Sequence, residues 1–259
     1  MEPYNVGLVG WGVVGGGVIE VLQRDGDLIR ERCGLDLRLV TVVDADLKRQ
    51  RAQTPQARLV TDIAEVNRDE SVRTVIHLVP GTGIARDLLR SSLEAGKHVI
   101  TANKALLAEH GDELFALAAK KKVCIAFEAA VAGGIPVIAA LRDGLVANRI
   151  ESIHAILNGT CNYILTKMER DGLPYAEALK KAQQLGYAET DPTLDVSGHD
   201  TAHKLAILAR IAFMGRVDLK GISVEGIQGI TPEDLESAKR LGCRIKLLAV
   251  ATRVANGVV

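Results

Sequence analysis

The feature of the sequence that most constrains its fold is the glycine-rich run GWGVVG at residues 10–15. It follows the apolar run NVGLVG at 5–10, a predicted strand, and precedes an apolar helical period that we expect to continue through Leu22. In a strand–turn–helix unit, the first glycine permits a tight turn, the second lets the backbone approach a pyrophosphate, and the third allows close packing. The helix N-terminus stabilises the negative charge. The motif predicts a dinucleotide site at Gly10, Trp11, Gly12, Val13, Val14 and Gly15.

An acidic residue stands where a ribose-binding carboxylate belongs in such a site. Asp44 ends the second apolar run, LRLVTVVD at 37–44. A carboxylate at this position binds the ribose hydroxyls, which favours NAD over NADP. Two alternatives remain open at this point. Asp44 could cap a helix, and the basic residues beyond it could bind a 2′-phosphate or form a solvated basic face; these are Lys48, Arg49 and Arg51.

Short apolar runs alternate with helical periods up to residue 130. After the first two strands we expect strands at 74–79, 98–102 and 123–130, with helices at 84–95 and 105–121. This alternation is typical of a parallel sheet with helices on both faces, which binds ligands at the carboxyl ends of its strands. The sequences VPGT and TANK follow the third and fourth strands, so we assign to the cofactor site Pro80, Gly81, Thr82, Ala102 and Lys104.

The pattern changes after Ala130, where helices dominate and strands are few. We expect strands at 152–157 and 246–254 and an extended segment at 218–230. Helices are expected at 136–145, 160–171, 174–185, 199–214 and 231–242, the last opened by a Thr-x-x-Asp capping box. The predicted fold class is α/β, with a Rossmann-type parallel sheet domain over 1–130 followed by an α+β domain over 131–259.

Composition excludes several classes of function. The 259 residues carry 32 basic and 32 acidic side chains, so no field of one sign favours nucleic acid or an anionic membrane. No apolar run is long enough for a transmembrane helix, and the N-terminus lacks the basic region of a signal peptide. The four cysteines are scattered without a Cys-x-x-Cys pair, which is typical of reduced thiols in a cytoplasmic protein.

An unusual density of acids precedes one lysine in GYAETDPTLDVSGHDTAHK, residues 186–204. Asp200 and Lys204 are four residues apart on a predicted helix and therefore share a face. Spacing alone leaves two interpretations open. The pair could be a weak surface ion pair, or it could belong to a pocket whose carboxylates bind an ammonium group while the lysine moves a proton. The preceding loop carries the other acids, Glu189, Asp191 and Asp195.

Four motifs in this order resemble one family. They are GxGxxG, TANK, NGTCNYIL and A-x3-GYAE-x-DP-x2-D-x-SGHD-x3-K, and the chain resembles homoserine dehydrogenase from residue 5 to about residue 250. That family interconverts L-homoserine and L-aspartate 4-semialdehyde with NAD or NADP, in threonine, methionine and isoleucine biosynthesis. The resemblance implies a Rossmann-type domain and a substrate and dimerisation domain, hence a homodimer or higher homo-oligomer.

The resemblance also assigns roles to particular residues. Lys204 resembles the proton-transfer lysine and Lys104 a second active-site lysine that contacts substrate. The two motifs NGTCNYIL and GYAE-to-Lys imply a substrate pocket formed by Glu189, Asp200, Gly186, Tyr187, Asn158 and Thr160. The turn EAAVAGGIP resembles a site for a monovalent cation such as sodium, with ligands from Glu128, Val131, Gly133 and Ile135.

Family members run longer than this chain, so we interpret it as a C-terminally shortened form. Two alternatives therefore stay open: another NAD(P)-dependent dehydrogenase of amino-acid or semialdehyde metabolism, and a nucleotide-binding fragment without turnover. The sequence does not decide which lysine carries the proton. We favour Lys204 because it belongs to the acid-rich segment.

Overall fold

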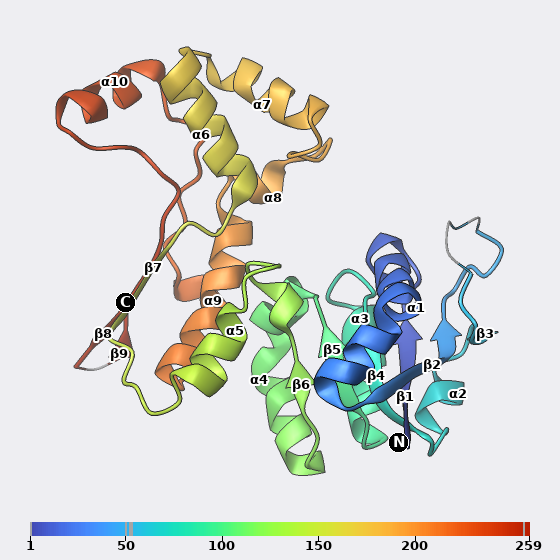
Figure 1. Ribbon diagram of the computed structural model, residues 1–259. Coiled ribbons are helices and arrows are strands. Elements are labelled where there is room, and N and C mark those ends of the chain that lie inside the picture. The colour runs from blue at the N-terminus through green and yellow to red at the C-terminus, as the bar shows by residue number, and fades with distance from the viewer. Residues whose placement is uncertain (1, 50, 52–53, 256) are drawn as a thin grey trace. The chain divides into compact units, whose positions relative to one another are not determined.

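The computed structural model describes residues 2–49, 51, 54–255 and 257–259. The chain divides into two compact units, Met1–Gly134 and Ile135–Val259, and Figure 1 labels their helices and strands. Each unit is described by itself below.

The first unit is built on a six-stranded parallel sheet with the strand order β3-β2-β1-β4-β5-β6. The predicted Rossmann-type sheet is thus confirmed, because crossovers on both sides of β1 give the doubly wound order. Strand β3 was not predicted, since three residues are too few to show a period. The strands are β1 (Pro3–Val9), β2 (Asp36–Val43), β3 (Arg58–Val60), β4 (Val72–His77), β5 (His98–Thr101) and β6 (Ile125–Ala126).

In the described part of this unit, four α-helices lie between the strands. They are α1 (Val13–Cys33), α2 (Ala64–Asn67), α3 (Ile84–Glu94) and α4 (Lys104–Lys121), and a 3₁₀ turn, η1 (Glu128–Ala130), follows β6. The expected end of the first helix at Leu22 is wrong. The helix continues through a charged, largely exposed segment and ends where Gly34 adopts φ 67° and donates its N–H to the Arg30 carbonyl. The expected strand at 123–130 is also wrong beyond Ala126, because the chain turns into η1.

Alternate residues of the central strands pack on opposite faces of the sheet. On one face Leu8 and Val42 form a cluster with Ile19 of α1, and on the other Val9 and Val43 pack with Val66 of α2. Burial of both faces explains why these strands read as continuous apolar runs.

A buried polar network ties β4 to two helices. The hydroxyl of Ser92 donates to the Asn67 side-chain oxygen at 2.8 Å, so the 3.0 Å contact between Ser92 and His77 is donated by Nε2 of the imidazole. Burial lowers the pKa of His77 to about 3, and the imidazole is therefore neutral.

The second unit combines a small antiparallel sheet with helices, which confirms the predicted α+β class. Its strands are β7 (Ser152–Ala155), β8 (Ala249–Val254) and β9 (Gly257–Val258), in the order β7-β8-β9. Its helices are α5 (Val137–Ala139), continued by a π-helical turn at Ala140–Gly144, then α6 (Gly159–Asp171), α7 (Tyr175–Gln184), α8 (Thr193–Val196), α9 (His199–Phe213) and α10 (Pro232–Arg240).

The predicted capping box of α10 is confirmed, since Thr231 and Asp234 exchange hydrogen bonds between side chain and backbone. The prediction of an extended segment at 218–230 is wrong at its start, where Leu219–Gly221 form a 3₁₀ turn, and strand β8 begins at Ala249 rather than at 246.

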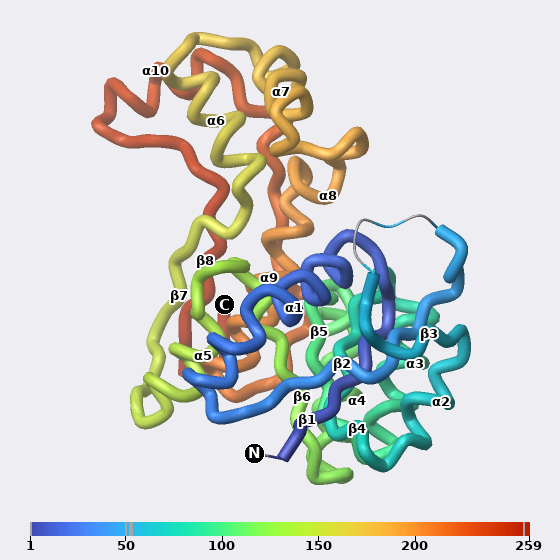
Figure 2. The backbone as a smooth tube through the Cα atoms, turned by 45° about the vertical axis from the view of Figure 1, so that its right-hand side comes forward, coloured from blue at the N-terminus to red at the C-terminus, as the bar shows by residue number. Residues whose placement is uncertain are grey.

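Two separate cores stabilise the second unit. Helices α6, α7 and α10 gather away from the sheet, as Figures 1 and 2 both show, around buried side chains such as Ile164, Leu165 and Met168. Helix α9 packs against β8 through Leu205, Ala209 and Ala251. Within the described residues, no helix is long and apolar enough to cross a membrane.

Candidate active site

The glycine turn has the geometry that dinucleotide binding requires. Gly10 adopts φ +96°, and a Cβ on Gly15 would lie 2.2 Å from the carbonyl oxygen of Gly10. A Cβ on Gly12 would meet nothing within 4 Å, which leaves space for a ligand to approach the backbone. Among the residues that the structure describes, no side chain caps the N-terminus of α1, and Val13 is 91% exposed. The first N–H groups of the helix are therefore open to an anion such as a pyrophosphate.

Asp44 is hydrogen-bonded to the glycine turn. Its carboxylate accepts the backbone N–H of Trp11 at 2.7 Å and of Asp46 at 2.9 Å, and it pairs with the Arg51 guanidinium at 2.9 Å. Burial alone would raise the pKa of Asp44, but the two N–H donors and the Arg51 charge together hold that pKa below its usual value. Asp44 is therefore ionised and oriented toward the cofactor turn.

Arg51 is not part of a solvated basic face, which corrects one of the alternatives above. Its side chain is 8% exposed, its guanidinium lies 4.3 Å from the centre of the Trp11 ring, and its Nε donates to the Trp11 carbonyl at 2.7 Å. Another of its donors binds the Arg49 carbonyl at 3.0 Å. Three of its five N–H groups are therefore committed within the protein.

The ends of β4 and β5 are joined by a residue that the sequence indicated only as a turn former. Asn103 caps α4 by accepting the Leu106 N–H at 3.0 Å, and its amide donates to the carbonyls of Val79 at 3.0 Å and Gly81 at 2.7 Å. The two loops that carry Pro80, Gly81, Thr82, Ala102 and Lys104 are thus connected at the carboxyl edge of the sheet. Lys104 is the first residue of α4.

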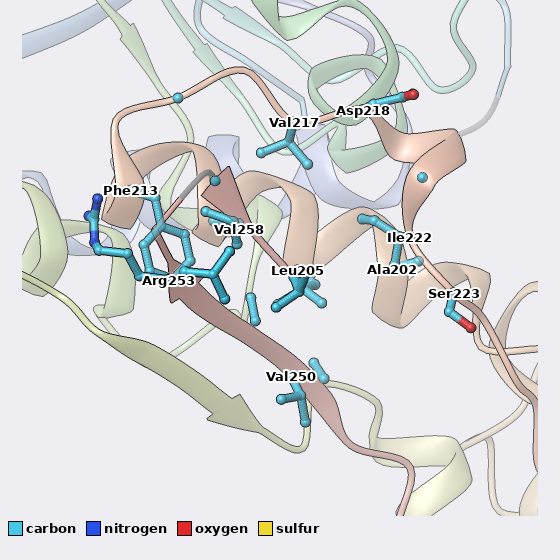
Figure 3. A pocket seen from close by; sticks show the side chains of 18 of the residues that line it. Ala202, Leu205, Phe213, Val217, Asp218, Ile222, Ser223, Val250, Arg253 and Val258 are labelled. Carbon is cyan, nitrogen blue, oxygen red and sulfur yellow. The ribbon is translucent and has the colours of Figure 1, made fainter.

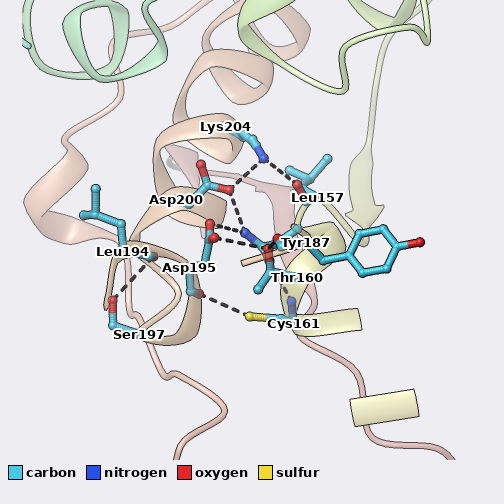
Figure 4. A network of polar contacts seen from close by, with 10 residues as sticks. Leu157, Thr160, Cys161, Tyr187, Leu194, Asp195, Ser197, Asp200 and Lys204 are labelled. Atoms are coloured by element: carbon cyan, nitrogen blue, oxygen red, sulfur yellow. Dashed lines mark hydrogen bonds and ion pairs between the residues drawn. The ribbon is translucent and has the colours of Figure 1, made fainter. Parts of the chain in front are cut away.

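In the second unit, Asp200 and Lys204 form a buried ion pair (Figure 4). Lys204 Nζ lies 2.6 Å from Asp200 Oδ2 and also donates to the Leu157 carbonyl at 2.7 Å. Asp200 is 2% exposed and the Lys204 side chain 16%, so this is not a solvent-exposed surface pair.

Two further polar residues join this pair from the NGTCNYIL motif. The Asn158 amide donates to Asp195 Oδ1 at 2.7 Å and to Asp200 Oδ2 at 2.9 Å. The Thr160 hydroxyl donates to the Tyr187 carbonyl at 2.6 Å and lies 3.2 Å from Asp195 Oδ2. The sequence analysis named Asp195 among the clustered acids but did not assign it to the substrate pocket.

The thiol of Cys161 lies beside the same acids and donates to the Asp195 carbonyl at 3.2 Å. Burial, followed by the charges of Asp195 and Asp200, raises the pKa of Cys161 to about 12. The thiol is therefore protonated and unreactive.

Among the described residues, the remaining acids of the motif form no hydrogen bond or ion pair with this group. Asp191 lies just before α8 and accepts the Thr193 N–H at 3.1 Å. Glu189 lies on the exposed turn after Gly186, and Gln183 binds that turn by donating to the carbonyls of Glu189 and Thr190 at 3.2 Å each. Tyr187 is 59% exposed, with its ring 4.9 Å from that of Tyr163.

The backbone at residues 225–227, outside the GYAE-to-Lys motif, packs against the acid-bearing turn, which is the end of α8 and the start of α9 at residues 195–198. A Cβ on Gly226 would lie 2.3 Å from the Val196 carbonyl oxygen, and the Ile227 N–H donates to that same oxygen at 2.9 Å. Gly198, at φ +87°, begins α9 at this contact, where a Cβ would lie 3.1 Å from the Glu225 carbonyl oxygen. Only glycines permit this approach of the two backbones.

The turn assigned to a monovalent cation has an irregular backbone. Glu128 opens η1, and positive φ angles occur at Ala132 (50°) and Gly134 (87°). Glu128, Val131 and Gly133 belong to the first unit and Ile135 begins the second. The described residues contain no cluster of three or more His, Cys, Asp or Glu that could hold a metal ion. Carboxylate and carbonyl oxygens, as in this turn, suit a hard ion.

A pocket of about 980 Å³ lies on another side of α9 (Figure 3). Its lining is largely apolar, from α9, β8, β9 and the 215–225 segment, and it includes Leu205, Phe213 and Val258. Neither Asp200 nor Lys204 lines this pocket. The pocket is therefore separate from the Asp200–Lys204 ion pair.

Comparison with known proteins identifies the family. Residues 10–128 match the family model described as "Homoserine dehydrogenase, NAD binding domain", and residues 136–259 match that described as "Homoserine dehydrogenase". The chain belongs to the homoserine dehydrogenase family. The resemblance in the four motifs is thereby confirmed.

The chain is similar to homoserine dehydrogenases from several bacteria. It is 45% identical to that of Neisseria gonorrhoeae, over 100% of this chain and 59% of the relative. It is 44% identical to that of Bacillus subtilis, over 98% of this chain and 59% of the relative. A homoserine dehydrogenase structure from Thiobacillus denitrificans is 46% identical, with a TM-score of 0.94 over 100% of this chain and 60% of that one. The chain thus spans about 59% of the length of these curated relatives.

Proposed function

We propose that this chain catalyses the NAD(P)-dependent interconversion of L-homoserine and L-aspartate 4-semialdehyde. The observation that carries the proposal is the buried Asp200–Lys204 pair at 2.6 Å, in a unit that matches the family. An ammonium held by a buried carboxylate beside a helix N-terminus is a group placed for proton transfer rather than for surface solubility.

Lys204 has the donors that this chemistry needs. Two of its three N–H groups bind Asp200 and Leu157, which leaves one for a substrate oxygen. In aldehyde reduction, this N–H passes its proton to the carbonyl oxygen as that oxygen gains negative charge. In alcohol oxidation, the proton moves in the opposite direction, from the substrate hydroxyl to the Lys204 nitrogen. The nicotinamide, when bound, supplies or accepts the hydride.

The acids and neighbouring residues would bind the amino-acid end of the substrate. Carboxylates such as Asp200 and Glu189 suit its ammonium group, and Lys104 suits its carboxylate or reacting oxygen. We assign further substrate contacts to Gly186, Tyr187 and Thr160; the Thr160 hydroxyl already contacts this turn by donating to the Tyr187 carbonyl at 2.6 Å.

Turnover tests the proposal directly. L-homoserine is added to the 259-residue protein with NAD or, separately, NADP at mildly alkaline pH, and nicotinamide absorbance is followed. We expect reduction of the cofactor. Cofactor binding without reduction would favour the non-catalytic fragment, and faster reduction with another amino alcohol would favour a different dehydrogenase.

The geometry at Asp44 supports NAD as the preferred cofactor. The carboxylate is ionised and keeps one lone pair, on Oδ2, for a ribose hydroxyl, whereas Arg51 is committed to Trp11, Arg49 and Asp44. A 2′-phosphate would have to break that arrangement and would also face the Asp44 charge.

Asp44→Ala is therefore expected to weaken NADH binding at least roughly tenfold, about 1.4 kcal/mol, and NADPH binding less. Trp11 is the one tryptophan of the sequence, and energy transfer from it to the reduced cofactor measures both affinities. Asp62→Ala is the control, because Asp62 follows β3 and caps the Ala64 N–H at 2.8 Å. An equal loss for both cofactors would show that Asp44 does not select the ribose.

We also propose that the second unit forms a homodimer through its sheet. In β8, Ala249 and Ala251 are buried against α9, whereas Val250 and Val254 are exposed. Exposed apolar side chains also flank the paired strands, at Ile156 after β7 and Leu248 before β8. Such an unpartnered apolar face is typical of an interface between copies.

Val250→Lys is expected to convert the dimer to a monomer, because a charge would be buried without a partner at the interface. Light scattering of the purified variant measures the mass. Leu241→Lys, at an 80% exposed position beside α10, is the control and should leave the mass unchanged. A wild-type monomer, or a Val250→Lys dimer, would contradict the proposed interface.

We propose sodium, or a similar monovalent cation, at the turn formed by Glu128 and the carbonyls of Val131, Gly133 and Ile135. Bound cation would stabilise the folded protein by mass action. We expect the thermal midpoint of the wild type to be about 2 °C or more higher in sodium chloride than in choline chloride. Glu128→Gln should abolish this difference, and a difference of the same size in the variant would count against the site.

All four cysteines are free. This fits a reducing compartment, so we infer a cytoplasmic location, which cell fractionation tests.

A further inference from the structure

Asn158 caps helix α6 and also binds two of the acids near Lys204. It lies between β7 and α6 and is 4% exposed. Its side-chain oxygen caps α6 by accepting the Cys161 N–H at 2.8 Å. This contact fixes which end of the amide is the oxygen, because an N–H group cannot accept a hydrogen bond.

The other end of the amide bridges two carboxylates from different helices. Its two hydrogens point to Asp195 of α8, at 2.7 Å, and to Asp200 of α9, at 2.9 Å. Two carboxylates this close repel each other, and a neutral group that donates to both offsets that repulsion without adding charge. Both N–H groups of the Asn158 side chain are used in this way.

The same Asp200 oxygen accepts both Asn158 and Lys204, which lies 2.6 Å away. The carbonyl of the adjacent Leu157 accepts a second hydrogen bond from Lys204 at 2.7 Å. The Asn158 side chain therefore binds the Asp200 carboxylate, and the Leu157 carbonyl binds the Lys204 ammonium.

We propose that Asn158 is a positioning residue, which fixes Asp200 and through it Lys204 and does not itself touch the substrate. The inference deepens the proposed function and rests on it. It also replaces the expectation, drawn from the family resemblance, that Asn158 contacts the substrate. A buried amide whose donors are both committed to carboxylates has none left for a ligand.

The first test separates the capping of α6 by Asn158 from its hydrogen bonds to Asp195 and Asp200. Serine caps helices as well as asparagine does but has no amide to span two carboxylates. We expect Asn158→Ser to lower kcat at least about tenfold, because small displacements of a reacting group have large kinetic effects. If KM for L-homoserine rises while kcat stays unchanged, Asn158 binds substrate and the proposal is overturned.

Thr231→Ala is the matched control. Thr231 caps α10 in the same unit by accepting the Asp234 N–H at 3.2 Å, and among the described residues it forms no hydrogen bond with Asp195 or Asp200. This variant should lower the thermal midpoint by a few degrees and leave kcat within about twofold. Equal kcat losses in the two variants would mean that lost stability alone explains the effect.

A second test does not depend on turnover. Unfolding free energies are measured for Asn158→Ser, Lys204→Met and the double variant. If Asn158 acts on Lys204 through Asp200, the double variant is destabilised by less than the sum of the single losses. The cycle that pairs Thr231→Ala with Lys204→Met should be additive. Additivity in both cycles overturns the positioning role, whereas absence of wild-type turnover would remove the proposed function and leave this measurement to decide the inference.

Discussion

Lys204→Met is expected to lower kcat by roughly 10²–10⁴-fold, the range that general acid–base groups contribute. Methionine keeps the apolar stem of the side chain and removes only the ammonium. Cofactor affinity should stay within about twofold, because we assign cofactor binding to the glycine turn and Asp44 and proton transfer to Lys204. Steady-state kinetics and energy transfer from Trp11 measure the two quantities.

Lys167→Met is the matched control for that experiment. Lys167 also pairs with an aspartate four residues away, Asp171, at 2.9 Å, but both side chains are more than one third exposed. An exposed pair of this kind contributes little, and we expect kcat to be unchanged. Turnover by Lys204→Met at the wild-type rate would exclude this lysine as the proton carrier and direct attention to Lys104.

Gly15→Ala is expected to have the second large effect. The added Cβ would lie 2.2 Å from the Gly10 carbonyl oxygen, so either the helix or the turn must shift. We expect a loss of about 1–3 kcal/mol in the unfolding free energy and a loss of NADH affinity of at least roughly a hundredfold, because the helix N-terminus no longer faces the pyrophosphate.

Gly17→Ala tests whether the effect of Gly15→Ala depends on where the methyl group is added rather than on the loss of any glycine from α1. Gly17 lies two residues further along α1, and a Cβ there meets nothing within 4 Å. Alanine should raise the unfolding free energy by about 0.5–1 kcal/mol, since glycine is unfavourable inside a helix. Thermal unfolding and cofactor titration of both variants decide the question. Similar behaviour of the two would show that Gly15 is not needed for close packing.

The sequence predicts those parts of the molecule that local pattern and general topology determine. The glycine turn, the alternation of strands and helices, and the shared face of Asp200 and Lys204 all depend on residues close in the chain. The full extent of α1 was not predicted because its second half is charged and exposed, with Arg30 paired to Asp27 at 2.8 Å. Helices held by such pairs lack a strong apolar period.

Contacts between distant segments were beyond prediction. Asn158 and Asp195 are 37 residues apart, and only the packing of α6 beside α8 brings them together. Arg51 reads as a solvated basic residue until the chain folds it over Trp11, 40 positions earlier. In each case the sequence offers a polar side chain with several plausible partners, and the tertiary fold selects one of them.

The contact of Gly226 with the Val196 carbonyl also bears on how the site can change during evolution. The acid-bearing turn is bounded on one side by main chain, which no side-chain substitution can enlarge. Under the proposed function, we expect adaptation to a longer or shorter substrate to act through an altered 222–230 segment or through side chains away from this contact. A selection for new substrate specificity should accordingly recover substitutions in that segment, even though none of its residues belongs to a recognised motif.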